Sequence, residues 1–248
     1  MRVGHLSGCF LRVREVSSGD LNTFFDIYNR HYDAVCFEQF KSDFSEKDFV
    51  IILKEEDSGK IKGFSTIALY DRIVCGKRIK LLYSGDTVIE KSHWGQQELL
   101  KTWCNIAAHI YSQLDRGVYF YWLLMSKGYR TYLYLPFFFK EFYPCNSLDF
   151  PSFEKSVVDD FGRFKYPKFY DPLHGLVIFD QSKGHLKPSI AETSIIKQNN
   201  PHVSHFLNLN PGFYKGDELV CITRIEPQNM KSFAKKYFII PIEECVAV

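Results

Sequence analysis

The stretch from Ile61 to Pro144 constrains the fold of this chain more than any other part of it. A strand ends in SGDTVI at residues 84–89, the turn HWGQQ follows at residues 93–97, and a long amphipathic helix begins there. A strand that runs through a glycine-containing turn into a helix leaves the first N–H groups of the helix without helical partners. Such a helix start favours negative charge. The sequence therefore predicts an α/β fold with a phosphate-binding turn at residues 93–97.

Hydrophobic spacing and turn residues predict the other elements of the chain. Strands are expected at residues 12–16, 49–53, 61–69, 72–75, 78–83, 118–125, 176–179 and 219–223. Helices are expected at 21–28, 37–44, 97–114 and 153–161, and in 126–142, which Pro136 should split into two. The residues from Ser17 to Asp20 are suited to cap the first helix. The segment between 179 and 219 contains three prolines and is expected to be poor in helix.

Composition excludes several classes of function. The 31 Lys and Arg residues nearly balance the 29 Asp and Glu residues, so a nucleic-acid-binding surface is not expected. The chain has no run of eighteen apolar residues and hence no predicted membrane span. Its first residues lack the apolar core of a secretory signal, and its seven cysteines form no CxxC motif. Reduced thiols, a cytoplasmic location and no bound metal are the expectations.

The order of elements resembles that of the GNAT superfamily of acyl-CoA N-acyltransferases from Arg12 to Pro144. Three stretches carry the resemblance: REV at 14–16 with the helix after it, VIEKSHWGQQELL at 88–100, and FFFKEFYP at 137–144. The resemblance implies a mixed, mostly antiparallel central sheet flanked by helices. It places an acyltransferase core at residues 1–144, followed by an extension at 145–248 that completes the sheet and covers the cleft.

The sequence departs from the family pattern in its phosphate motif and at its acid. The family has Arg or Gln, two residues, Gly, one residue, and Gly or Ala, whereas His93, Gln96 and Glu98 occupy those positions here. Glycine matters in such a motif because the backbone must approach the pyrophosphate closely. The position of the family's tyrosine acid is occupied by Phe139.

Acyl transfer to an amine requires a base, a donor to the thioester oxygen and an acid for the leaving thiolate. Asp86 lies where the family often has its base, although Asp in an SGDT stretch is also a common turn residue. The resemblance implies a backbone N–H of Val88 or Ile89 as the oxygen donor. Tyr134 is the preferred acid, because it comes just before the Pro136 break.

The predicted binding residues for the donor fall in two groups. The turn contributes Trp94, Gly95, Gln96 and Gln97. Lys127 and Arg130 are spaced to share one face of the next helix, where they would contact phosphates or simply be solvated. His202 and His205 have a short spacing, but they are interpreted as structural or surface residues rather than as metal ligands.

Three functions remain open from the sequence. The first is an acyltransferase that moves an acyl group from acyl-CoA, or from the phosphopantetheine thioester of an acyl carrier protein, to a small-molecule or peptide amine. The second is a GNAT-fold module that has lost its chemistry and binds a ligand or partner. The third is a different α/β enzyme, in which the strand containing Val88 would be paired continuously rather than splayed from its neighbour.

Overall fold

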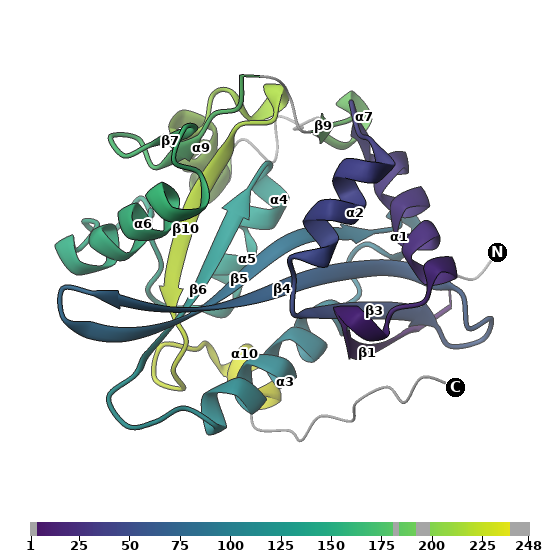
Figure 1. Cartoon of the computed structure of the whole chain (residues 1–248), viewed down its shortest axis with the longest axis horizontal. Helices are drawn as coiled ribbons and strands as arrows, with labels where there is room; N and C mark the ends of the chain where they lie inside the picture. Colours follow the sequence, from purple (N-terminus) through teal and green to yellow (C-terminus); the bar gives the residue numbers. More distant parts are fainter. Residues whose placement is uncertain (1–3, 181–183, 192–198, 239–248) are drawn as a thin grey trace.

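The computed structural model describes residues 4–180, 184–191 and 199–238. Its centre is an eight-stranded sheet in the order β1-β3-β4-β5-β6-β10-β8-β7 (Figure 1). The strands of this sheet are β1 (Leu6–Arg12), β3 (Phe49–Glu55), β4 (Ile61–Val74), β5 (Lys77–Ile89), β6 (Tyr119–Ser126), β7 (Tyr170–Asp171), β8 (Leu176–Val177) and β10 (Glu218–Arg224). Neighbouring strands are antiparallel except for β5 and β6, which are parallel. The predicted mixed, mostly antiparallel sheet is therefore confirmed.

Helices cover both faces of the sheet (Figure 1). They are α1 (Ser18–His31), α2 (Phe37–Ser45), α3 (Glu98–Ser112), α4 (Tyr129–Tyr132), α5 (Tyr134–Phe138), α6 (Ser152–Lys165), α7 (Pro188–Ala191), α9 (Pro201–Leu209) and α10 (Ser232–Tyr237). One face packs against α3, α4, α5, α9 and α10 in a single large core. The opposite face forms two cores, one beneath α1 and α2 and the other beneath α6. Alternate residues of β6, such as Trp122 and Leu123, belong to opposite cores. This explains the unbroken apolar sequence of that strand.

Several predicted elements are confirmed with small shifts. Ser17 caps α1 by accepting a hydrogen bond from the Asp20 backbone. The amphipathic helix predicted at 97–114 is α3. The strand predicted at 12–16 was wrong, because β1 covers Leu6–Arg12 and residues 13–15 form a 3-10 turn in which the Glu15 carboxylate accepts from the Arg12 backbone.

The long hairpin of β4 and β5 corrects another prediction. These strands pair from Gly63 with Ile89 to Val74 with Lys77, instead of being interrupted near residues 70 and 84. The ribbon turns at Cys75 and Gly76, which both have positive φ, as a tight two-residue hairpin turn requires. A single turn therefore replaces the more broken pattern expected from the sequence.

Of two predictions based on proline, the pair of short helices in 126–142 is confirmed as α4 and α5 but with the break at another residue, and the lack of helix between 179 and 219 was wrong. The break after β6 falls at Leu133. Pro136 lies in the first turn of α5, where backbone N–H groups make no helical hydrogen bond, so a proline is tolerated there. The segment expected to be poor in helix contains α9. Asn200 accepts hydrogen bonds from the backbone of His202 and Val203, and Pro201 occupies the first helical position, which is a typical helix start.

Residues after 144 contribute to the same sheet. The strand β10 pairs with β6, and β8 and β7 extend the sheet from β10. A separate two-stranded sheet joins β2 (Tyr32–Asp33), just after α1, to β9 (His185–Leu186). The part of the chain after residue 144 thus pairs both with β6 in the main sheet and with β2 beside α1.

Two general expectations can be compared with the structure. Among the described residues, no helix combines the length and apolar character needed to cross a bilayer. The expectation that all cysteines are reduced was wrong for Cys9, which is disulfide-bonded, because spacing along the chain does not reveal which thiols meet in space. Cys36, Cys75, Cys104, Cys145 and Cys221 are free thiols.

Candidate active site

The parallel strands β5 and β6 separate at the centre of the sheet. Their pairing runs from Ile79 with Tyr119 to Ser84 with Leu124, whereas β5 continues to Ile89 paired with β4. The separation coincides with a bulge, where the register between β4 and β5 shifts after Ser65. A bulge bends its strand and increases its twist. The continuous pairing that would have favoured a different α/β enzyme is therefore contradicted.

The separated part of β5 presents backbone N–H groups to the opening. Glu90 donates to the Lys62 carbonyl, and hydrogen-bonded pairs alternate along antiparallel strands. The pair Phe64–Val88 is therefore also hydrogen-bonded, and the N–H of Val88 points to β4. The N–H groups of Thr87 and Ile89 point the other way, into the opening. Of the two predicted oxygen donors, Ile89 thus has its N–H directed away from β4, and Val88 has its N–H directed toward β4.

A narrow cavity of about 20 Å³ lies in this opening. Its walls come from β5, β6, α3 and the α4–α5 segment, and they are mostly apolar: Ser65, Ser84, Thr87, Leu99, Leu100, Trp103, Trp122, Leu124, Thr131, Tyr134 and Phe138. The indole N–H groups of Trp103 and Trp122 both donate to the Ser84 hydroxyl, at 3.4 and 2.8 Å. We call this cavity the slot.

Tyr134, the predicted acid, is one of the residues that line the slot. Burial raises the pKa of its phenol to about 12, so the side chain is protonated at neutral pH and is able to donate. Phe139 is fully buried in the core beneath α3 and contacts Trp103 edge to face. The tyrosine that lines the slot is therefore Tyr134, which precedes Phe139, the residue aligned with the family's acid, by five positions.

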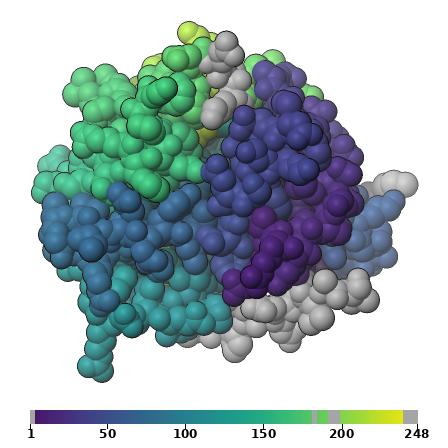
Figure 2. Space-filling view, in the orientation of Figure 1, coloured from purple at the N-terminus to yellow at the C-terminus, as the bar shows by residue number. Residues whose placement is uncertain are grey.

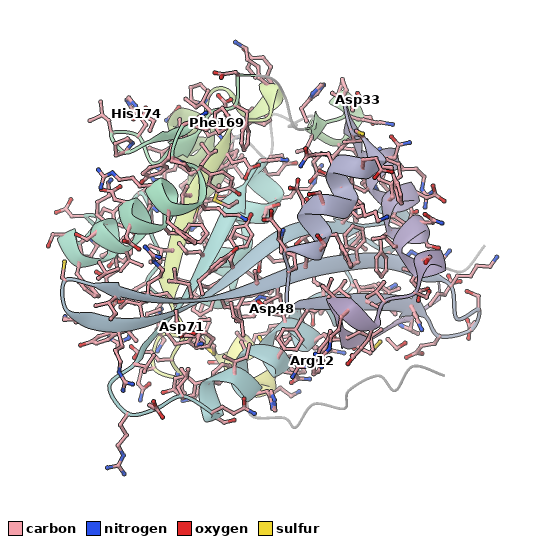
Figure 3. The ribbon with its side chains drawn as sticks, in the orientation of Figure 1. Arg12, Asp33, Asp48, Asp71, Phe169 and His174 are labelled. Carbon is pink, nitrogen blue, oxygen red and sulfur yellow. The ribbon has the colours of Figure 1, made fainter. Side chains whose placement is uncertain are left out.

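A second, much larger cavity of about 850 Å³ opens on the other face of the sheet. One flank comes from α1, β2 and α2, with Leu186 of β9 paired to β2, and the other from residues 165–169 at the end of α6, with residues 179 and 180. In the space-filling view these flanks are the dark blue and green regions that face one another (Figure 2). Phe169 and Asp33 mark the two sides of this part of the molecule (Figure 3). We call this cavity the cleft.

The slot and the cleft meet at two residues. Thr87, on the separated part of β5, and Thr131, on α4, line both cavities. The Thr87 hydroxyl also shares a hydrogen bond of 2.7 Å with the Ser65 hydroxyl. The slot and the cleft are thus neighbours, with Thr87 and Thr131 between them.

Asp86, the predicted base, lies in the cleft next to this junction. It belongs to the bulged part of β5 and not to a turn. The side chain is half-buried, and no described residue forms a hydrogen bond or an ion pair with it. Its charge raises the pKa of Tyr28 and Tyr32, in both of which burial is the largest cause of the increase. A carboxylate in this position can accept a proton from a molecule bound in the cleft.

Lys127 and Arg130 do not share a helix face, because α4 begins only at Tyr129. Lys127 points into the cleft, 3.3 Å from Glu218. The Arg130 guanidinium lies over the Trp94 ring, 4.7 Å from its centroid, and donates to the Ile190 carbonyl. Lys127 therefore belongs to the cleft, whereas Arg130 lies beside the turn that contains Trp94.

Two side chains of the predicted phosphate-binding turn form hydrogen bonds with the backbone of neighbouring segments. The Trp94 indole donates to the Ile89 carbonyl at 2.8 Å. The Gln96 amide accepts from the Leu6 backbone and donates to the Gly4 carbonyl, so it secures the N-terminal strand. Gly95 is exposed with φ of 92°, and no side chain caps α3 at Gln97. Trp94, Gly95 and Gln97 border the helix start, whereas Gln96 has a structural partner.

Sequence reasoning missed much of the cleft. Lys47, Tyr83, Tyr166 and Glu218 line it, yet they come from four distant segments and follow no motif. The histidines of α9 lie elsewhere, and burial lowers the pKa of both His202 and His205. No metal-binding group of three or more His, Cys, Asp or Glu side chains occurs in the described part of the chain.

No family model and no curated protein matches this chain. Solved structures do resemble it over part of its length. Glucosamine-6-phosphate N-acetyltransferase from Arabidopsis thaliana has 16% identity over 60% of this chain and 97% of its own, with a TM-score of 0.39. An acetyltransferase from Trypanosoma brucei has 14% identity over 59% of this chain and all of its own, with a TM-score of 0.41.

A probable N-acyltransferase of unknown function from Enterococcus faecalis has 13% identity over 56% of this chain, with a TM-score of 0.38. The matched part spans only a third of the Enterococcus protein. The mixed, mostly antiparallel sheet of this chain, with one parallel pair that separates at β5 and β6, is the arrangement that the sequence resemblance implies.

Proposed function

We propose that this protein is an acyltransferase that moves an acyl group from an acyl-CoA, or from an acyl-carrier thioester, to an amine. The observation that carries the proposal is the junction of the slot and the cleft at Thr87 and Thr131. A thioester arm entering through the slot would meet an amine held in the cleft beside backbone N–H groups that point into the opening. The apolar walls of the slot suit an acyl chain.

The residues at the junction can supply the three groups that the reaction needs. Asp86 takes a proton from the ammonium of the acceptor, which leaves a neutral amine to attack the thioester carbon. The N–H of Ile89, with that of Thr87 beside it, donates to the carbonyl oxygen as negative charge develops there. The C–S bond then breaks, and Tyr134 gives its proton to the departing thiolate.

The remaining predicted binding residues have places in this proposal. Trp94, Gly95 and Gln97 border the uncapped start of α3, and Arg130 stacks on Trp94, so these residues would face the phosphates of the donor. Lys127 would act on the acceptor side. The described residues after 144 extend the sheet and contribute to the lining of the cleft, which supports a role of this part as an extension that covers the site. The cytoplasmic location stays a prediction.

One observation favours the second candidate, a binding module without acyl transfer. The slot measures only about 20 Å³, because Trp103, Trp122 and Phe138 fill much of the opening. A thioester would have to widen it. The glycines of the usual phosphate motif are also absent at Gln96 and Glu98.

Thermal-shift and transfer measurements separate the two candidates. The purified protein is tested against acetyl-CoA, longer acyl-CoAs, free CoA and pantetheine, and a ligand at a hundredfold excess over its Kd stabilises by about 2.7 kcal/mol. Acylated amines are then sought by mass spectrometry. We expect Tyr134→Phe and Asp86→Asn each to slow transfer by roughly 10²–10⁴-fold while donor binding persists. The matched controls are Tyr214→Phe and Asp26→Asn, at exposed positions. Failure to detect product from any thioester would leave the binding module as the function.

A further inference from the structure

The cleft contains a cation and an anion that are half-buried and lack an ion-pair partner. These are the ammonium of Lys47 and the carboxylate of Asp86, and no described residue of opposite charge lies within ion-pair distance of either. Lys47 donates one hydrogen bond, of 2.6 Å, to the Asp43 carbonyl. An ammonium has three donors, and a carboxylate accepts about four hydrogen bonds. Most of the bonding capacity of both groups is therefore open to a ligand.

The other charged residues of the cleft are occupied or exposed. Lys127 pairs with Glu218, and Lys165 pairs with Glu46. Asp43 accepts from the Gln39 amide at 2.9 Å. Lys168 and Asp180 lie at the solvent-exposed rim. Charge recognition inside the cleft thus depends on Lys47 and Asp86.

The fold holds these two charges close together. A Cβ atom at Gly85 would lie 2.8 Å from Lys47 Cε and 2.5 Å from Thr66 Oγ1, so the lysine side chain lies against β5 in space that the glycine leaves open. Asp86 is the next residue on that strand. Burial, the largest effect, lowers the pKa of Lys47, and Asp86 opposes this shift. The two side chains therefore act on each other within the cleft.

A ring-lined surface borders the same space. Phe169 and Phe179 contact one another at 5.1 Å between centroids, and Phe179 meets Tyr166 at 5.8 Å. These rings and Phe40 line the cleft. Such a surface suits a large apolar group, since burying one removes apolar area from water.

We propose that the cleft binds an α-amino acid with a large apolar side chain, its ammonium on Asp86 and its carboxylate on Lys47. Burying an unpaired charge is unfavourable, and a zwitterion satisfies both charges at once. The inference rests on the proposed function in one respect only, that the bound ammonium is the acyl acceptor. Asp86, beside Thr87, would then present the amine to the junction with the slot.

Calorimetric titration tests the proposal without any thioester. The probes are L-phenylalanine, its amide, which lacks the carboxylate, and 3-phenylpropionate, which lacks the amine. Since a hydrogen bond to a charged group contributes about 1.5–3 kcal/mol, we expect both analogues to bind at least about tenfold more weakly than L-phenylalanine. Lys47→Met should abolish the preference over the amide, and Asp86→Asn the preference over phenylpropionate. Lys47→Arg should retain the first preference, and Lys41→Met, on the exposed face of α2, should retain both.

Each result has a definite meaning. Equal affinity for L-phenylalanine and its amide, no binding of L-phenylalanine, or a preference that survives Lys47→Met would overturn the proposal. Those results would leave acyl transfer to another amine intact. Conversely, the expected pattern of affinities without any transfer would support the amino-acid site and refute the acyltransferase.

Discussion

The buried ion pair between Lys127 and Glu218 gives the sharpest test of the energetics around the cleft. Lys127 Nζ lies 3.3 Å from Glu218 Oε1, and the side chains are only 17% and 9% exposed. Burial alone would lower the pKa of Lys127, but Tyr28 and Glu218 above all raise it well above its ordinary value. The ammonium is therefore charged in the folded state and depends on its partners.

Replacement of Glu218 by Gln leaves that charge buried without its carboxylate. Loss of one partner of a buried pair generally costs about 3–5 kcal/mol, and we expect about 3 kcal/mol here because Asp86 continues to act on Lys127. For a domain of this size the melting temperature should fall by roughly 6–12 °C. Urea unfolding followed by circular dichroism measures the free energy, and a differential scan measures the temperature.

Two variants control this experiment. Glu46→Gln removes the partner of Lys165, but the Glu46 side chain is 51% exposed, so a loss below about 1 kcal/mol is expected. The double variant Lys127→Met, Glu218→Leu removes both buried charges and should be near wild type in stability. If Glu218→Gln changed the free energy of unfolding by less than the Glu46 variant does, the reasoning about the buried pair would be refuted.

Three further predictions concern other parts of the molecule. Asn229→Ala should lower the free energy of unfolding by about 2–4 kcal/mol in urea titrations, because the buried amide donates to three oxygens and accepts from a backbone N–H; an effect below 1 kcal/mol would contradict this. Gly85→Ala should cost about 1–3 kcal/mol by the same assay, since its Cβ displaces Lys47, whereas Gly19→Ala has no atom nearer than 3.8 Å and should cost nothing. Burial raises the pKa of Tyr32 to about 12, so its contribution of roughly 2–3 kcal/mol is complete below pH 10 and is lost as the pH rises through 12; Tyr32→Phe should flatten this alkaline decline.

Much of the fold could be predicted because it depends on local patterns. The apolar spacing of α3, the capping of α1 by Ser17 and the two-sided burial of β6 are each encoded within a few residues. The errors arose where a local signal has two meanings. Proline ends many helices, but Pro201 begins one and Pro136 fits inside the first turn of another.

The site itself was only partly accessible from the sequence. Asp86 and Tyr134 were predicted from their positions near the end of a strand and before Pro136, and they line the cleft and the slot respectively, but their catalytic roles stay predictions. Lys47, Tyr166 and Glu218 were not, because no spacing relates residues that meet only after folding. The direction of the Ile89 N–H depends on the pairing register between β4 and β5, which sequence alone does not reveal.

The sequence by itself determined most of the strands and helices, though not β1 or α9, and it determined which faces are apolar, since those properties follow from the periodicity of side chains along the backbone. Only the tertiary structure decided that β5 leaves β6 after Ser84, that two cavities meet at Thr87, and that Lys47 lies across Gly85 beside Asp86. Those features depend on strand register and on close contacts between segments remote in the chain. Packing in three dimensions selects them, and periodicity does not.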